Sequence, residues 1–195
     1  MQKIMFNDQF CLTKAVLDRI KEMTRRLIKG EASVIAQELF EDGFPKLETE
    51  HFIEKYSRYK VGDVVAIAQC YKDIAASLCP FGASPHSIDP FRVSAGWKNK
   101  MFVRADYMPH QIKITDIRIE RLQDISDDDC LKEGINVYSP CSECGAEIYV
   151  IWGIDEGECF DTPGEAYAAL IDRISGKGTW DSNPWVFVYS FQLLK

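Results

Sequence analysis

The sequence predicts an α+β fold, in which peripheral short helices surround a mainly antiparallel or mixed β-sheet that closes into a small barrel. Two observations predict it. Strand-like segments occur at 64–68, 112–119 and 185–193, and helical patterns occur at 13–20, 126–134 and 162–176. These segments do not follow the regular strand–helix–strand alternation that is typical of a parallel α/β sheet.

The N-terminal elements are an extended segment and a helix. Residues 1–10 predict the extended segment, and Thr13 can cap a helix with apolar positions at helical spacing up to Ile20. Lys21 and Thr24 then fall at or just beyond the end of this helix.

Three segments follow with different patterns. Residues 30–57 are amphipathic but interrupted by turn residues, which predicts one or two short helices that form an insertion or lid. The β-branched run at 64–68 predicts a buried strand. Residues 72–97 contain several prolines and glycines and predict a long loop.

The C-terminal half contains the clearest signals. Isoleucines alternate with polar residues over 112–119 but slip by one position between Ile114 and Ile117, which predicts a half-exposed strand with a bulge. Ser126 begins a short helix that ends at Gly134. The capping box of 162–165 begins a helix that ends at 176, and 185–193 is a strand by composition.

Length and composition indicate one globular domain over 1–195, with insertions at about 30–57, 72–95 and 138–160. The sequence shows neither a membrane-spanning run nor the apolar stretch of a signal peptide, so we expect a cytoplasmic protein that does not bind a membrane. Seven irregularly spaced cysteines then predict free thiols. We expect no cofactor, and the oligomeric state is not predicted.

Charge is distributed unevenly along the chain. A net charge of −7 argues against binding nucleic acid by bulk electrostatics. Residues 91–121, however, carry seven Lys or Arg against three acids, whereas 124–172 carry thirteen acids and one Lys. This pattern has two explanations. The basic segment forms a face that contacts phosphate locally, or both segments are ordinary solvated surfaces.

Several motifs, in this order, resemble those of the ASCH family. The family signature Gly-x-Lys-x-x-Thr-x-Arg aligns with Lys21, Thr24 and Arg26, although Arg19 replaces the glycine. Residues 59–65, 117–135 and the tryptophan-containing segments 96–102 and 180–191 are also similar to the family, in particular to members encoded by phages and prophages. The acidic position of the family falls on Glu133.

The resemblance implies a PUA-like β-barrel with a cleft for RNA or a nucleotide. Some small bacterial members are amidohydrolases that deacetylate N4-acetylcytidine, with a catalytic set that would correspond here to Lys21, Thr24 and Glu133. The residues suit this chemistry: a threonine hydroxyl is the nucleophile, a desolvated lysine the base and a protonated glutamate the acid. Arg26 would orient a phosphate or carbonyl. Without the resemblance, solvated residues at a chain bend would be the simpler explanation.

Other candidate residues are less specific. Arg19, Lys98 and Lys100 are candidate ligand-binding cations, and Trp97 and Trp180 are candidate stacking surfaces for bases. Cys141-x-x-Cys144 resembles half of a zinc knuckle, but no second pair follows at suitable spacing, so we favour reduced thiols at a hairpin tip and predict no metal.

Three hypotheses of function remain. The first is a binding module for RNA or a modified nucleoside, with a cleft lined by Lys21, Thr24, Arg26 and Glu133. The second is an amidohydrolase that deacylates N4-acetylcytidine-like nucleosides through the same residues. The third is a phage accessory protein that acts by protein–protein contact.

Overall fold

The computed structural model describes residues 1–41, 43, 46–79, 85–138, 147–154 and 158–194. In this part of the chain, five strands form a mixed sheet with the hydrogen-bonded order β1–β3–β4–β7–β2. β1 and β3 are parallel, and the other neighbouring strands are antiparallel. The strands of this sheet are β1 (Lys3–Ile4), β2 (Met23–Leu27), β3 (Val64–Ile67), β4 (Gln111–Arg121) and β7 (Trp185–Leu193).

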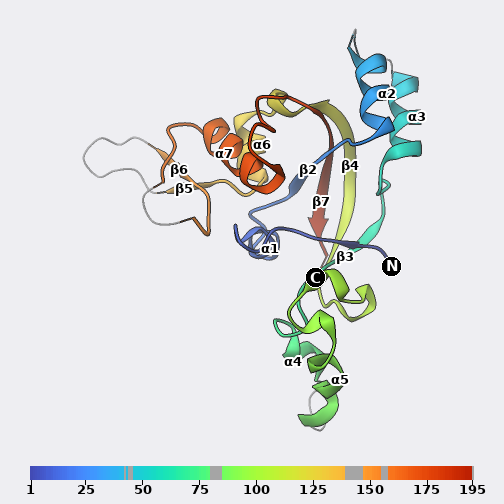
Figure 1. The fold of residues 1–195 in the computed structure, drawn as a ribbon, viewed down its shortest axis with the longest axis vertical. Coiled ribbons are helices and arrows are strands. Elements are labelled where there is room, and N and C mark those ends of the chain that lie inside the picture. The colour runs from blue at the N-terminus through green and yellow to red at the C-terminus, as the bar shows by residue number, and fades with distance from the viewer. Residues whose placement is uncertain (42, 44–45, 80–84, 139–146, 155–157, 195) are drawn as a thin grey trace.

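Short helices surround the sheet, as Figure 1 shows. α2 and α3 lie at one end of the sheet and α4 and α5 at the other, while α6 and α7 lie together beside it. The predicted α+β class is therefore confirmed. The helices are α1 (Leu12–Leu17), α2 (Glu31–Phe40), α3 (Lys46–Tyr56), α4 (Ala75–Leu78), α5 (Asp89–Arg92), α6 (Asp127–Lys132) and α7 (Pro163–Ser175).

The closed barrel is not confirmed. Among the described residues, no ladder joins the edge strands β1 and β2, so the sheet is open between them. A side chain bridges this opening instead: Nη2 of Arg26, on β2, donates a hydrogen bond of 2.6 Å to the carbonyl oxygen of Met5, just after β1. A second, two-stranded sheet consists of β5 (Asn136–Tyr138) and β6 (Ile148–Val150).

The elements of the C-terminal half follow their sequence signals. The register of β4 against β7 shifts between Ile114 and Asp116, so the predicted bulge is confirmed and the isoleucines on both sides of it stay buried. The hydroxyl of Ser126 caps α6 by accepting from the backbone N–H of Asp129. Thr162 caps α7 in the same way.

Two expectations need correction. Thr13 does not cap α1, which begins at Leu12; its hydroxyl donates to Asp8 at 2.5 Å instead. The predicted loop at 72–97 contains α4 and α5, and these cover a second, smaller core around Tyr71 and Met108. Single-turn 3-10 helices complete the described chain at Pro85–Ile88, Ala95–Trp97, Lys100–Phe102, Ala105–Tyr107 and Leu122–Asp124.

The larger core lies between the sheet and the helices α2, α3 and α7. Its largest fully buried side chains include Tyr167 of α7, Tyr189 of β7 and Phe52 of α3. Burial of this apolar surface is the main force that holds the helices against the sheet. None of the described helices is both long enough and apolar enough to span a bilayer.

Candidate functional site

Two chain turns bring Lys21 and Glu133 together. After α1 the chain reverses through Arg19, which adopts a left-handed φ of 60°, and the N–H of Lys21 donates to the carbonyl of Ala15. Glu133 follows the last residue of α6, and Gly134 continues the chain with φ 102°, a conformation that favours glycine. Each turn therefore directs one ionisable side chain to the same place.

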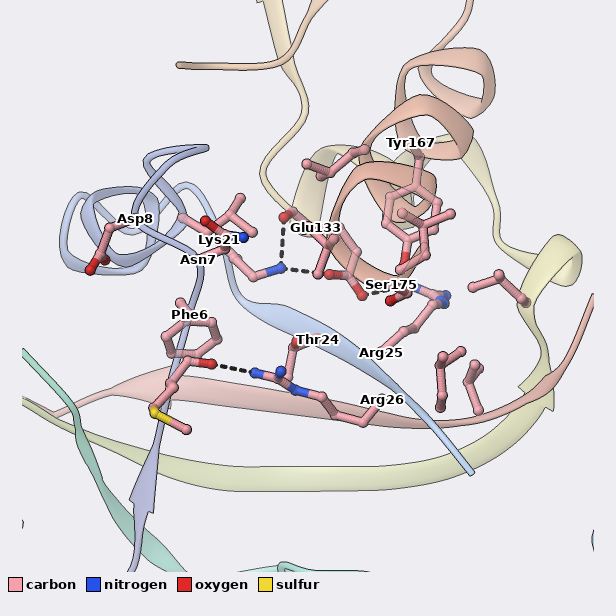
Figure 2. Close-up of a pocket in the computed structure, with 18 of the residues that line it drawn as sticks. Phe6, Asn7, Asp8, Lys21, Thr24, Arg25, Arg26, Glu133, Tyr167 and Ser175 are labelled. Atoms are coloured by element: carbon pink, nitrogen blue, oxygen red, sulfur yellow. Dashed lines mark hydrogen bonds and ion pairs between the residues drawn. The ribbon is translucent and has the colours of Figure 1, made fainter. Parts of the chain in front are cut away.

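Lys21 and Glu133 form a buried ion pair. The ammonium nitrogen of Lys21 lies 2.5 Å from Oε2 and 2.6 Å from the carbonyl oxygen of Glu133, as drawn in Figure 2. The two residues are only 2% and 4% exposed. Burial lowers the pKa of Lys21, and the attraction of Glu133 opposes this shift in part.

Arg25 connects this pair to further acids. It is buried on β2 and donates to Glu120, Asp129 and Glu133 at distances between 2.6 and 3.3 Å. Burial opposes its charge, but the carboxylates outweigh burial and raise the pKa of Arg25. Arg118 also contacts Glu120 and Asp129. Both oxygens of Glu133 thus accept hydrogen bonds from cations.

A pocket of about 590 Å³ opens in front of these residues. The residues that line it include Lys21, Thr24, Arg25, Arg26 and Glu133. Within the described chain, the hydroxyl of Thr24 makes no hydrogen bond and Arg26 has no carboxylate within 4.0 Å. Both side chains therefore have unused hydrogen-bonding capacity. Apolar residues of α1 and α7 form part of the wall, namely Leu12, Leu170, Ile171 and Ile174.

The pocket is positively charged on an acidic protein. Among the described residues, five cationic side chains line it against two acids, although the whole chain has a net charge of −7. The acids are Asp8 and Glu133, and Asp8 forms an ion pair of 2.7 Å with Lys100. An excess of cations in a concave site attracts anionic ligands. The cations are Lys21, Arg25, Arg26, Lys29 and Lys100.

The structure brings together only some of the predicted site residues. Lys21, Thr24, Arg26, Lys100 and Glu133 line the pocket, whereas the other candidates do not. Trp97 packs against the smaller core, and Trp180 packs edge-on against Tyr167 with 6.3 Å between ring centroids. Lys98 is exposed, and Arg19 is held near Leu193.

Among the described residues, three charged side chains that line the pocket have no counterpart among the predictions: Asp8, Arg25 and Lys29. Arg25 carried a signal, because a charged residue between Thr24 and Arg26 in a short strand must point to the opposite face from both of them. Its acidic partners lie 95 to 108 residues away, and no local pattern identifies them.

Cys141 and Cys144 lie outside the described residues, and within those residues no three His, Cys, Asp or Glu side chains are grouped to hold an ion.

In comparisons with models of known protein families, with curated proteins and with solved structures, nothing matches this chain.

Proposed function

We propose that the pocket binds a nucleoside unit of RNA. The observation that carries this proposal is the combination of the Lys21–Glu133 pair with two groups that have unused hydrogen-bonding capacity, the hydroxyl of Thr24 and the guanidinium of Arg26, in one cavity. The cavity volume of about 590 Å³ lies within the range of about 300–1,000 Å³ that is typical of small-molecule sites.

The donor and acceptor groups suit the edge of a base. An exocyclic amino group can donate to Glu133, and the adjacent ring nitrogen or carbonyl can accept from Lys21. Lys21 has three N–H donors, and its bonds to Glu133 account for two of them. The aliphatic side chains of α7 can pack against the face of the base, while Arg26 provides charge for a phosphate.

The resemblance to the ASCH family supports the same proposal. The four residues that align with its motif positions, Lys21, Thr24, Arg26 and Glu133, all line one cavity. Arg19 stands at the position of the motif glycine, and its φ of 60° is one that glycine adopts at no steric cost. We also propose that the sheet is a PUA-like barrel that is open at one seam, where Arg26 replaces a strand ladder.

A second candidate function is amide hydrolysis of an N4-acylated cytidine. It is favoured by the free hydroxyl of Thr24 and by the lowered pKa of Lys21. The Thr24 oxygen would attack the acyl carbonyl while neutral Lys21 takes its proton. The C–N bond would then break, with the proton returned to the departing amino group, and water would hydrolyse the acyl-threonine ester. Glu133, which the sequence predicts as the acid, accepts hydrogen bonds from two cations and would instead orient Lys21.

The test uses purified protein with cytidine and N4-acetylcytidine. Thermal stabilisation by either nucleoside, reduced in Glu133→Gln, is the result expected for binding. Release of cytidine, lost in Thr24→Val and retained in the matched exposed variant Thr115→Val, would establish the hydrolase. Absence of both stabilisation and turnover in the wild type would refute the proposal.

A further inference from the structure

A second hollow of about 290 Å³ adjoins the first pocket. The two share four lining residues, Met5, Arg26, Leu27 and Lys29, so they meet at the opening between β1 and β2. The far wall of the second hollow comes from the end of α3 and the residues after it, Tyr56, Arg58 and Tyr59. Arg26 therefore stands at the boundary between two neighbouring concave sites.

The second hollow is cationic, and none of the described residues that line it is an acid. Its charged lining residues are Arg26, Lys29 and Arg58, and none of them forms an ion pair within the described part of the chain. In the first pocket, by contrast, Lys21, Arg25 and Lys100 each have a carboxylate partner. The uncompensated positive charge thus lies at the boundary and in the second hollow.

The side chains at the boundary suit a phosphodiester. The hydrogen bond from Arg26 to Met5 uses one of its five N–H donors, and its guanidinium lies 5.8 Å from the ring centroid of Phe6. A guanidinium held in this way can donate two parallel hydrogen bonds to phosphate oxygens. Arg58 lies 5.5 Å from the ring centroid of Tyr59, and the half-buried ring of Tyr56 lines the same hollow.

We propose that the two hollows are consecutive subsites for one RNA strand. The recognised base occupies the first pocket, the phosphodiester lies at Arg26 and Lys29, and the neighbouring nucleotide occupies the second hollow beside Arg58 and Tyr56. Single strands are commonly held by cations along the backbone and by aromatic surfaces beside the bases. This inference rests on the proposed function and deepens it, since it assigns the phosphodiester and the neighbouring nucleotide of the same strand to a second subsite.

The test measures affinity for two probes, N4-acetylcytidine and a six-nucleotide single-stranded RNA that contains one N4-acetylcytidine. We expect wild type to bind the RNA at least about tenfold more tightly, because a phosphate adds charge-assisted hydrogen bonds. Arg58→Ala should lose about tenfold for the RNA and leave affinity for the nucleoside unchanged. Arg104→Ala, an exposed arginine outside both hollows, is the matched control and should change neither.

Salt dependence adds an independent measurement. For a single strand, each lost phosphate contact reduces the slope of log affinity against log salt by about 0.7, so Arg58→Ala should show this reduction and Arg104→Ala should not. If the nucleoside binds but the RNA binds no more tightly, or if the two variants lose affinity equally, the second subsite is refuted and the proposed function stands. If neither probe binds, both fail.

Discussion

Lys21 and Glu133 lie 112 residues apart in the chain, yet the ammonium of one is 2.5 Å from the carboxylate of the other inside the protein. Two buried charges are tolerated when each has a partner, and removal of one partner leaves the other in a medium that solvates it poorly. The energetic roles of the two residues differ, because Glu133 also accepts from Arg25.

The first prediction concerns this asymmetry. Glu133→Leu should destabilise the protein by about 3–5 kcal/mol, because it leaves Lys21 without a carboxylate and removes one partner of Arg25. Lys21→Met should cost clearly less, because Arg25 still pairs with Glu133. Urea unfolding of both variants and of the double variant measures the difference. Equal losses in the two single variants would contradict it.

The second prediction concerns alkaline pH. The pKa of Lys21 is lowered by burial from the ordinary 10.5, so between the folded and unfolded pKa values the unfolded chain binds more protons at this residue. The free energy of unfolding of wild type relative to Lys21→Met should therefore rise as the pH approaches 10.5 and level off above it. Chemical unfolding at a series of pH values measures this, and a constant or falling difference would be the contrary result.

The third prediction concerns thiol reactivity. Burial raises the pKa of Cys130 to about 12, whereas Cys159 is exposed. Since the thiolate is the reactive form, Cys130 should react with iodoacetamide at least about tenfold more slowly than Cys159 in the native protein. Peptide mass spectrometry follows each site separately. In urea the two rates should converge, and comparable native rates would show that Cys130 is not protected.

The fourth prediction concerns the turn after α1. Arg19→Gly should stabilise the protein by about 0.5–1 kcal/mol, because a left-handed residue with a Cβ is strained and this strain exceeds the entropic cost of glycine. Arg19→Ala retains the Cβ and serves as the control, with no gain expected. Thermal unfolding compares the two. A gain in Arg19→Ala as large as in Arg19→Gly would point to the charge of Arg19 as the cause.

Elements with local signals were predictable from the sequence. The bulge of β4 follows from the slip between Ile114 and Ile117, and the caps Ser126 and Thr162 fix the starts of α6 and α7. These features depend on residues within a few positions of each other. The predicted cap at Thr13 was wrong because its hydroxyl donates a hydrogen bond to the side chain of Asp8 and does not cap the helix.

The arrangement of the site was predictable only in part. The spacing of Lys21, Thr24 and Arg26 came from a motif, but the acids that meet Arg25 belong to β4 and α6 and depend on how the whole sheet folds. The open seam between β1 and β2 is likewise a long-range property. Trp97 and Trp180 were wrongly predicted to line the pocket. Trp97 packs against the smaller core, and Trp180 packs against Tyr167.

The acids around Arg25 also fix how β2 aligns with β7. In the observed register Arg25 lies opposite Val188, so that its side chain meets Glu120, Asp129 and Glu133. A shift by one residue would exchange the faces of the strand and carry Arg25 away, so that each of these carboxylates would lose one of its cation partners. Misaligned pairings are thereby penalised during folding, and the observed register is the one in which Thr24 and Arg26 line the same pocket as Glu133.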